Sequence, residues 1–335
     1  MLIFTLRRLL LAIPTLLVIS LVIYLLVDFA PGSPMSEIPL TVPPEVRRKM
    51  IAAMGADQPV FVRYVLWLRQ FFWVEPATLF DSWFGTHLAD GEQRILSWQS
   101  RSPVFMIIGQ RIPQTLTVVG TAYVLGAMIA LPIGIYSAYR QYSWFDQVGT
   151  FVAMIGFSVP TFFTGTLLII IFAVYLGWFP TKYDTTLHVS DWSSFLQQLR
   201  QMTLPVMTLS LANAAAISRY MRSSMLDNIT QDYVRTARAK GMTEQTVVLK
   251  HVLRNSLIPV VTIIALGIPS IFGGAIITEN LFGVNGIGAA LIGAINANDL
   301  PMVQTLAFIF AVLIVVFNLI ADVLYGFLDP RIRYD

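Results

Sequence analysis

The residues best placed to do chemistry in this chain lie in a basic, polar segment, residues 219–259, between two apolar runs. Its centre predicts two short helices that meet at Gly241, because glycine commonly ends helices in the left-handed conformation. The first covers residues 231–240, and the second starts from Thr243 as N-cap with Glu244 in its first turn. Such exposed charged turns suit docking of a partner, but the composition fits a basic cytoplasmic loop that only sets orientation equally well.

The second helix of this segment is predicted to be amphipathic. Its apolar stripe consists of Val248, Leu249, Val252 and Leu253, and its polar face carries Thr246, Lys250 and Arg254. Pro259 is expected to mark the beginning of the next segment.

Catalytic and nucleotide-binding motifs are missing from the sequence. None of the four lysines follows a glycine, so the chain lacks the G-x-x-x-x-G-K-[ST] loop that cradles phosphates. His87, His188 and His251 stand in separate polar segments, which disfavours a metal site or a Ser-His pair and predicts solvated or locally hydrogen-bonded histidines. We therefore expect no enzymatic activity, no metal and no cofactor bound by this chain.

Two further groups of polar residues stand beside apolar runs, where ionisable side chains often serve a function. Asp322 has Asn318 one turn before it, and this pair is expected to bond a neighbouring helix or to cap a helix. Glu279 and Asn280 precede a glycine-rich stretch with Gly286 and Gly288, which permits tight backbone turns. A gate or receptor-facing loop and a simple tight connection are both consistent with this stretch.

The composition indicates an integral membrane protein. Of 335 residues, 56% are hydrophobic and 12% are charged, with a mean hydropathy of +0.69, whereas soluble domains carry about a quarter charged residues. The formal charge of +3 gives no reason to expect a nucleic-acid partner. Small residues in the second apolar run, including Gly126, Ala130 and Gly134, predict close packing of helix backbones.

The fold class predicted from these runs is all-α, with six transmembrane helices, since about 20 apolar residues span a bilayer. The expected spans are residues 9–30, 115–139, 148–178, 203–218, 257–280 and 304–328, and the fourth is expected to run on to Tyr220 or beyond. A kink at Pro160 or a tilt would absorb the extra length of the third span.

Four regions follow from this assignment. Residues 1–30 form an N-terminal transmembrane helix, and residues 31–114 form a long extracytoplasmic region with helices at 44–54 and 59–73. Aromatic residues from Trp67 to Trp73 predict a helix at the membrane interface, or alternatively a packed outer subdomain. Residues 115–328 form a five-helix core, which includes the polar loop 227–256, and residues 329–335 form a cytoplasmic tail.

The distribution of basic residues predicts that both termini are cytoplasmic. With that orientation, twelve Lys and Arg residues face the cytoplasm, against two in the shorter outer loops. The first outer region holds the remaining eight, but long loops translocate largely regardless of their charge.

Several stretches, taken together, resemble the dipeptide/oligopeptide/nickel family of ABC-importer permeases, in particular its B-type subunit. The strongest are DYVRTARAKG (residues 232–241) and HVLRNSLIPVVT (residues 251–262), which resemble the EAA loop with Arg235 in place of the glutamate. Weaker similarity covers residues 54–59, 80–85, 156–160, 279–288 and 329–333.

This resemblance implies a type I ABC-importer-like permease core in a bacterial or archaeal cytoplasmic (inner) membrane. It implies a heterodimer with a C-type permease, two ATPase subunits that use ATP and Mg, and an extracytoplasmic binding protein. The residues expected to form the ATPase-coupling loop are Arg235, Thr236, Ala237, Arg238, Lys240, Gly241, Thr243 and Glu244. Ala237 and Gly241 would set its shape, and the charged residues would dock.

The main alternative is a self-sufficient secondary transporter. Such carriers tend to contain repeated halves with broken helices in matching positions, and here the sequence indicates one break, at Pro160. The substrate stays open, because members of the resembling family carry dipeptides, oligopeptides, glutathione, nickel chelates or sugars.

Overall fold

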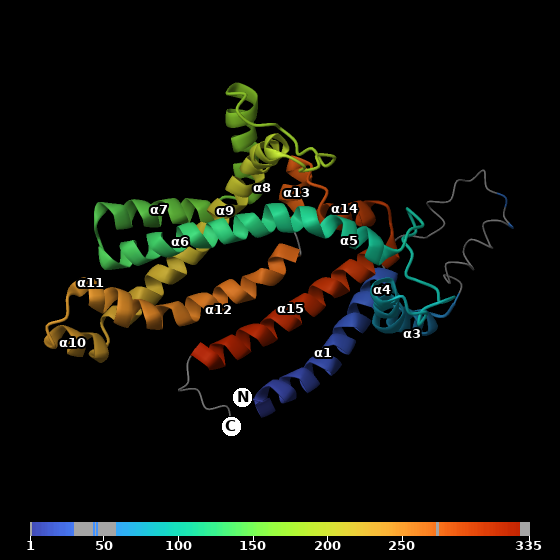
Figure 1. Cartoon of the computed structure of the whole chain (residues 1–335), viewed down its shortest axis with the longest axis horizontal. Helices are drawn as coiled ribbons and strands as arrows, with labels where there is room; N and C mark the ends of the chain where they lie inside the picture. The colour runs from blue at the N-terminus through green and yellow to red at the C-terminus, as the bar shows by residue number, and fades with distance from the viewer. Residues whose placement is uncertain (1, 30–42, 44, 46–57, 273–274, 329–335) are drawn as a thin grey trace. The chain divides into compact units, whose positions relative to one another are not determined.

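The computed structural model describes residues 2–29, 43, 45, 58–272 and 275–328 (Figure 1). Within these residues the regular secondary structure is helical, with one isolated bridge between Leu96 and Pro103, so the all-α prediction is confirmed for this part of the chain. Apart from residue 45, the expected helix 44–54 lies outside the described residues, as do the tail 329–335 and most of the segment 54–59.

The chain divides into two compact units. Unit 1 comprises Met1–Leu9, Gln114–Gly288 and Val316–Asp335, and unit 2 comprises Leu10–Pro113 and Ala289–Val315. The elements of unit 1 are η2 (Leu116–Gly120), α6 (Thr121–Tyr139), α7 (Trp144–Ser158), α8 (Thr161–Leu168), η3 (Ile169–Tyr175), α9 (Trp192–Ile229), α10 (Asp232–Ala239), α11 (Glu244–Thr246), η4 (Val247–Val252), α12 (Leu253–Phe272) and α13 (Ile276–Phe282), where η denotes a π-helical turn. Unit 2 holds most of α1 (Leu2–Asp28), α3 (Val60–Arg69), η1 (Gln70–Val74), α4 (Glu75–Phe84), α5 (Val104–Thr115), α14 (Ile287–Asn296) and the first half of α15 (Leu300–Leu328).

Helix α9 is the organising element of unit 1. It is 38 residues long, starts with a capping box between Asp191 and Ser194, and packs along α6 as well as against α12, α7 and α8. Two glycines of α6 face it: a Cβ on Gly126 would lie 2.8 Å from the Cβ of Asn213, and one on Gly134 would lie 2.6 Å from the Cβ of Met221. The prediction of close backbone packing at these two glycines is confirmed.

We expect Gly134→Ala to destabilise unit 1, because the added methyl group would also lie 2.7 Å from the carbonyl oxygen of Ser218. Over-packing of this kind costs about 1–3 kcal/mol, to be measured as a lower midpoint of thermal unfolding in detergent. Gly109→Ala in α5 is the matched control, because a Cβ there meets nothing within 4 Å. If the two variants had equal unfolding midpoints, the α6–α9 contact would accommodate the added methyl group without loss of stability.

Among the described residues, four helices are long and apolar enough to cross a membrane: Leu6–Asp28, Val104–Tyr139, Glu244–Ile271 and Leu300–Val323. Two bent pairs raise the number to six if each is one span; they are Trp144–Ser158 with Thr161–Tyr175, bent by 103°, and Ile276–Phe282 with Ile287–Asn296, bent by 91°. The expected break at Pro160 is therefore present, as a sharp bend between separate helices.

Other span predictions need correction. The fifth span was expected over residues 257–280, but its helix runs unbroken from Glu244 through Pro259 and ends at Phe272. Proline is tolerated there because local adjustment of a membrane helix satisfies the freed backbone groups. Residues 276–282 form helix α13, which belongs to the second bent pair. The expectation of a single break, at Pro160, was therefore wrong.

The expected fourth span, residues 203–218, lies inside α9, which is not among the apolar candidates in the described chain. Neighbouring helices bury many α9 residues, including Thr208 and Ser218. Their hydroxyls donate to backbone carbonyls of α9 itself, Thr208 to Leu204 at 2.9 Å and Ser218 to Ala215 at 3.3 Å. The face of a helix that packs against other helices can carry such residues, because that face is not exposed to lipid.

The aromatic helix of unit 2 is longer than expected, because α3, η1 and α4 run on without interruption to Phe84 and end at Gly85 with φ +65°. Trp67 is 5% exposed and packs against Tyr24, Phe71 and Phe308. Trp73 is 56% exposed instead. The segment thus forms a packed core and also presents aromatic side chains outward.

Candidate functional site

The predicted glycine-jointed helices are present as α10 and α11, which we call the α10–α11 hairpin (residues 232–246). Gly241 has φ +76°, and its N–H donates to the carbonyl oxygen of Arg238 at 2.9 Å. Thr243 is the N-cap of α11 by its extended backbone, although its hydroxyl bonds that of Thr246 at 2.8 Å instead of a backbone N–H. The second helix is not short, because α11 continues through η4 into α12.

The inner face of the hairpin is anchored in a hydrophobic core. Val234 and Ala237 of α10 are 0% and 5% exposed and pack in one cluster with Met221 and Met225 of α9. The same cluster contains Val247, Val248 and Val252 of η4. The five-residue repeat of the π-helical turn places both Val247 and Val252 inside. Leu249, expected in this apolar stripe, is 51% exposed, which corrects that assignment.

The outer face of the hairpin is polar and charged. Of the eight residues expected to form the coupling loop, seven are exposed, and Ala237 is buried. The Arg238 guanidinium donates from Nη2 to Oε1 of Glu244 at 2.6 Å and from Nε to Oε2 at 3.0 Å, across the joint. These hydrogen bonds raise the pKa of Arg238 above its usual value. Arg235 lies 3.5 Å from Asp232, whereas Lys240 is exposed at the end of α10.

A second polar site surrounds Glu279 of α13, which is 1% exposed. Its Oε1 accepts from the hydroxyl of Thr115 at 2.9 Å, and the Thr115 oxygen accepts the N–H of Ile287 at 2.8 Å. The structure thus brings Glu279 together with Gly286 and Gly288: a Cβ on either glycine would lie within 3 Å of a Glu279 carboxyl oxygen. This geometry favours a tight connection.

The other expected polar residues lie apart from that site. Asn280 is exposed, and its side-chain amide donates to the carbonyl oxygen of Ile276 at 3.0 Å. Asp322 bonds a neighbouring helix, as predicted, through an ion pair with Arg8 of α1. Asn318 is exposed.

Not all histidines lie in the expected solvated or hydrogen-bonded environment. His87 is exposed, with its Nδ1 2.9 Å from Asp90. His251 is only partly buried, but its Nε2 is buried without a hydrogen-bond partner among the described residues, so the expected environment does not hold for that nitrogen. No group of three or more His, Cys, Asp or Glu residues in the described part of the chain could hold a metal ion.

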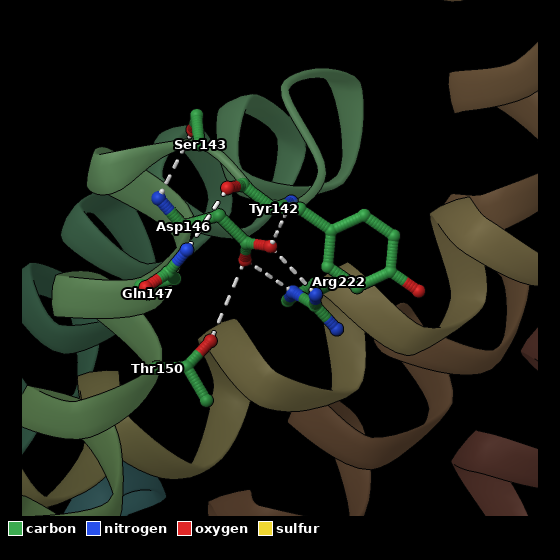
Figure 2. A network of polar contacts seen from close by, with 6 residues as sticks. All are labelled: Tyr142, Ser143, Asp146, Gln147, Thr150 and Arg222. Atoms are coloured by element: carbon green, nitrogen blue, oxygen red, sulfur yellow. Dashed lines mark hydrogen bonds and ion pairs between the residues drawn. The ribbon is translucent and has the colours of Figure 1, made fainter.

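A buried ion pair that was not predicted from the sequence joins α7 and α9 (Figure 2). Arg222 donates from Nε to Oδ1 of Asp146 at 2.6 Å and from Nη2 to Oδ2 at 2.8 Å. The Asp146 side chain is 3% exposed and that of Arg222 is 26% exposed. Ser143, the N-cap of α7 three residues before Asp146, was a signal for this helix start. Nothing local indicated a partner 76 residues away.

Comparison with known proteins identifies related sequences along the whole chain. Residues 130–334 match the family described as binding-protein-dependent transport system inner membrane component, and residues 1–119 match the N-terminal family of the same membrane components. The oligopeptide transport system permease protein AppB of Bacillus subtilis (strain 168) is 38% identical over 335 residues, covering 99% of both chains.

Other relatives have the same length. The glutathione transport system permease protein GsiC of Salmonella choleraesuis (strain SC-B67) is 36% identical, with all of both chains covered. A putative peptide transport system permease protein of Brucella abortus (strain 2308) is 34% identical over 98% of both chains. A crystal structure of an amino acid ABC transporter with histidines aligns with 68% of this chain and 95% of its own, at 14% identity and a TM-score of 0.48.

Proposed function

Since this chain belongs to the family of binding-protein-dependent transport system inner membrane components and is a permease subunit of an ABC importer, we propose that the α10–α11 hairpin couples it to ATPase subunits. The observation that carries the proposal is the two-sided hairpin. Val234 and Ala237 fix it to the core of unit 1, while Arg235 and Lys240 remain exposed. A partner that moved the outer face would move the packed helices beneath it.

The transport mechanism that we propose is alternating access. Closure of two ATPase subunits pushes the hairpin, and unit 1 transmits the push as a hinge or shear motion of packed helices. The Arg238–Glu244 bonds span the joint at Gly241 and hold α10 and α11 as one rigid lever. ATP and Mg bind to the ATPase subunits, and this chain has the role of a non-catalytic subunit.

We propose peptides as the substrate class. The support is the name of each relative: an oligopeptide, a glutathione and a putative peptide transport system permease, and glutathione is itself a tripeptide. The complex would contain a second, C-type permease that forms the other half of the translocation path. An extracytoplasmic binding protein would deliver the substrate.

The topology proposed for this multi-pass inner-membrane protein has six crossings with both termini in the cytoplasm. It counts α1, the helix Val104–Tyr139, the bent α7–α8 pair, α9, the helix that begins at Glu244, and α15. Residues 31–114 would then be extracytoplasmic, and the loop 227–256 and the tail 329–335 would be cytoplasmic. A self-sufficient secondary transporter is disfavoured, because the family relatives are named as components of transport systems.

Site-specific cross-linking in membranes that contain the whole complex tests this proposal. The chain has no cysteine, so Lys240→Cys introduces one reactive thiol on the exposed face. We expect it to capture an ATP-hydrolysing subunit. Asn285→Cys, exposed after α13, is the control and should not capture it. Capture of an ATPase from Asn285→Cys alone, or labelling of Lys240→Cys from the outer side, would reverse the proposed orientation.

A further inference from the structure

Helix α7 has an unusual attachment to unit 1. Asp146 is the one buried residue among the 15 of α7, all of which the structure describes. The large apolar residues of this helix, such as Phe151, Val152 and Met154, are exposed. Side-chain burial therefore does little to hold α7, and the buried contact that it does make is ionic.

Three residues donate hydrogen bonds to the Asp146 carboxylate (Figure 2). Besides two hydrogen bonds from Arg222, it accepts the N–H of Tyr142 at 2.9 Å and the hydroxyl of Thr150 at 3.4 Å. Tyr142 has φ +63°, a left-handed conformation that is uncommon for a tyrosine. The same carboxylate thus closes the α6–α7 turn and binds α9.

Arg222 lies near the end of α9 that carries the hairpin. Ile229, the last residue of α9, lies seven positions after Arg222, a distance of about 10 Å along the helix axis at 1.5 Å per residue. Next to Arg222, Met221 and Met225 belong to the cluster that contains Val234 of α10. Figure 1 shows the α6–α7 turn and the hairpin at the same end of unit 1.

We propose that the Asp146–Arg222 ion pair is the positioning contact that makes α7 move with α9 when the hairpin is pushed. This inference rests on the proposed coupling function. It adds the contact through which the bent α7–α8 pair would take part in the motion. Towards its other end α7 has close but weaker contacts with α9: Gly156 approaches Ala215, and the Arg219 guanidinium lies 4.3 Å from the centroid of the Phe157 ring. Without the ion pair, α9 would slide past α7.

The test compares Asp146→Asn with a matched control in the purified complex in proteoliposomes. Asp146→Asn keeps the shape of the side chain and leaves Arg222 without its counter-charge. Glu75→Gln is the control, because Glu75 pairs with Arg94 at 2.7 Å with side chains 1% and 29% exposed, nearly the same burial, but in unit 2. Uptake per ATP hydrolysed should fall roughly fivefold or more in Asp146→Asn, a typical lower value for coupling between sites, and should be unchanged in Glu75→Gln.

A distance measurement separates positioning from simple loss of stability. Spin labels at Val152→Cys on α7 and Asp227→Cys on α9, both exposed, report the α7–α9 distance by electron paramagnetic resonance. We expect one distance through the ATP cycle with the native pair, and a state-dependent distance with Asp146→Asn. Arg222→Lys, which keeps the charge but loses the bidentate geometry, should give an intermediate coupling ratio.

Two results would overturn this inference. One is a coupling ratio for Asp146→Asn equal to that of Glu75→Gln, and the other is the same α7–α9 distance in every state without the ion pair. The hairpin proposal would survive either result if Lys240→Cys still captured an ATPase subunit. If Lys240→Cys captured none while the native complex transported substrate, the coupling function itself would fail.

Discussion

Gly241→Pro is expected to abolish ATP-coupled uptake while the protein still inserts into the membrane. Gly241 has φ +76°, whereas proline fixes φ near −65°. The substitution also removes the N–H that bonds the Arg238 carbonyl oxygen at 2.9 Å. If proline destabilises the native conformation of the joint by about 3 kcal/mol, uptake should fall roughly a hundredfold. Uptake is to be measured in vesicles, with the amount of inserted protein quantified.

A graded series at Gly241 separates backbone conformation from side-chain bulk. A Cβ at this position meets nothing within 4 Å, so steric contact does not decide the outcome. Asn, which tolerates the left-handed region, should retain most uptake, and Asp should be intermediate, while Val should lose nearly as much as Pro. Gly177→Pro, at another open position with φ +65°, is the control and should keep ATPase binding. Normal uptake with Gly241→Pro would contradict a role for the joint.

Gly286→Ala is expected to cause a large loss of stability in unit 1. The added Cβ would lie 2.3 Å from Oε1 of Glu279 and 2.4 Å from the hydroxyl oxygen of Thr115. Since Glu279 is 1% exposed, its carboxyl group cannot avoid the methyl group by turning into solvent. We expect a loss of about 3 kcal/mol, at the upper end of over-packing costs, seen as a lower unfolding midpoint and less mature protein.

A double-mutant cycle shows whether the Glu279 side chain is the cause. Glu279→Ala removes the carboxyl group that the methyl group added by Gly286→Ala would strike, so the double variant should lose less stability than the sum of the two single variants. Gly293→Ala in α14, where a Cβ meets nothing within 4 Å, should be nearly neutral. If the stability losses of the two single variants were additive in the double variant, Gly286 would be required by the backbone conformation and not by contact with the Glu279 carboxyl group.

Local sequence signals were sufficient to predict the α10–α11 hairpin. A helix-ending glycine, an N-cap threonine and charged exposed turns depend on neighbours within a few residues, and the structure has Gly241, Thr243 and α10 close to where they were predicted. The limits of the second helix were not predicted correctly. Pro259 was taken as a boundary, but α12 continues through it from Leu253 to Phe272, as helices in membranes can where the freed backbone groups are satisfied locally.

Helix α9 shows why hydropathy alone was insufficient. The apolar run 203–218 marks less than half of a helix that extends from Trp192 to Ile229. Several of its polar residues, such as Thr208 and Ser218, are buried where α9 packs against other helices, so the length of the apolar run does not report the length of the helix. Burial by other helices depends on how the whole unit packs, so it cannot be read from the hydropathy pattern of one segment.

The sequence by itself determined that this is a helical membrane protein with a glycine-jointed basic hairpin, since apolar run length and turn chemistry are short-range properties. The tertiary structure alone decided which polar residues meet. Asp146 finds Arg222 across 76 positions, and Thr115 finds Glu279 across 164. Such pairs form because helix packing brings distant segments together, and a buried charge or hydroxyl group is stable only where that packing supplies its partner.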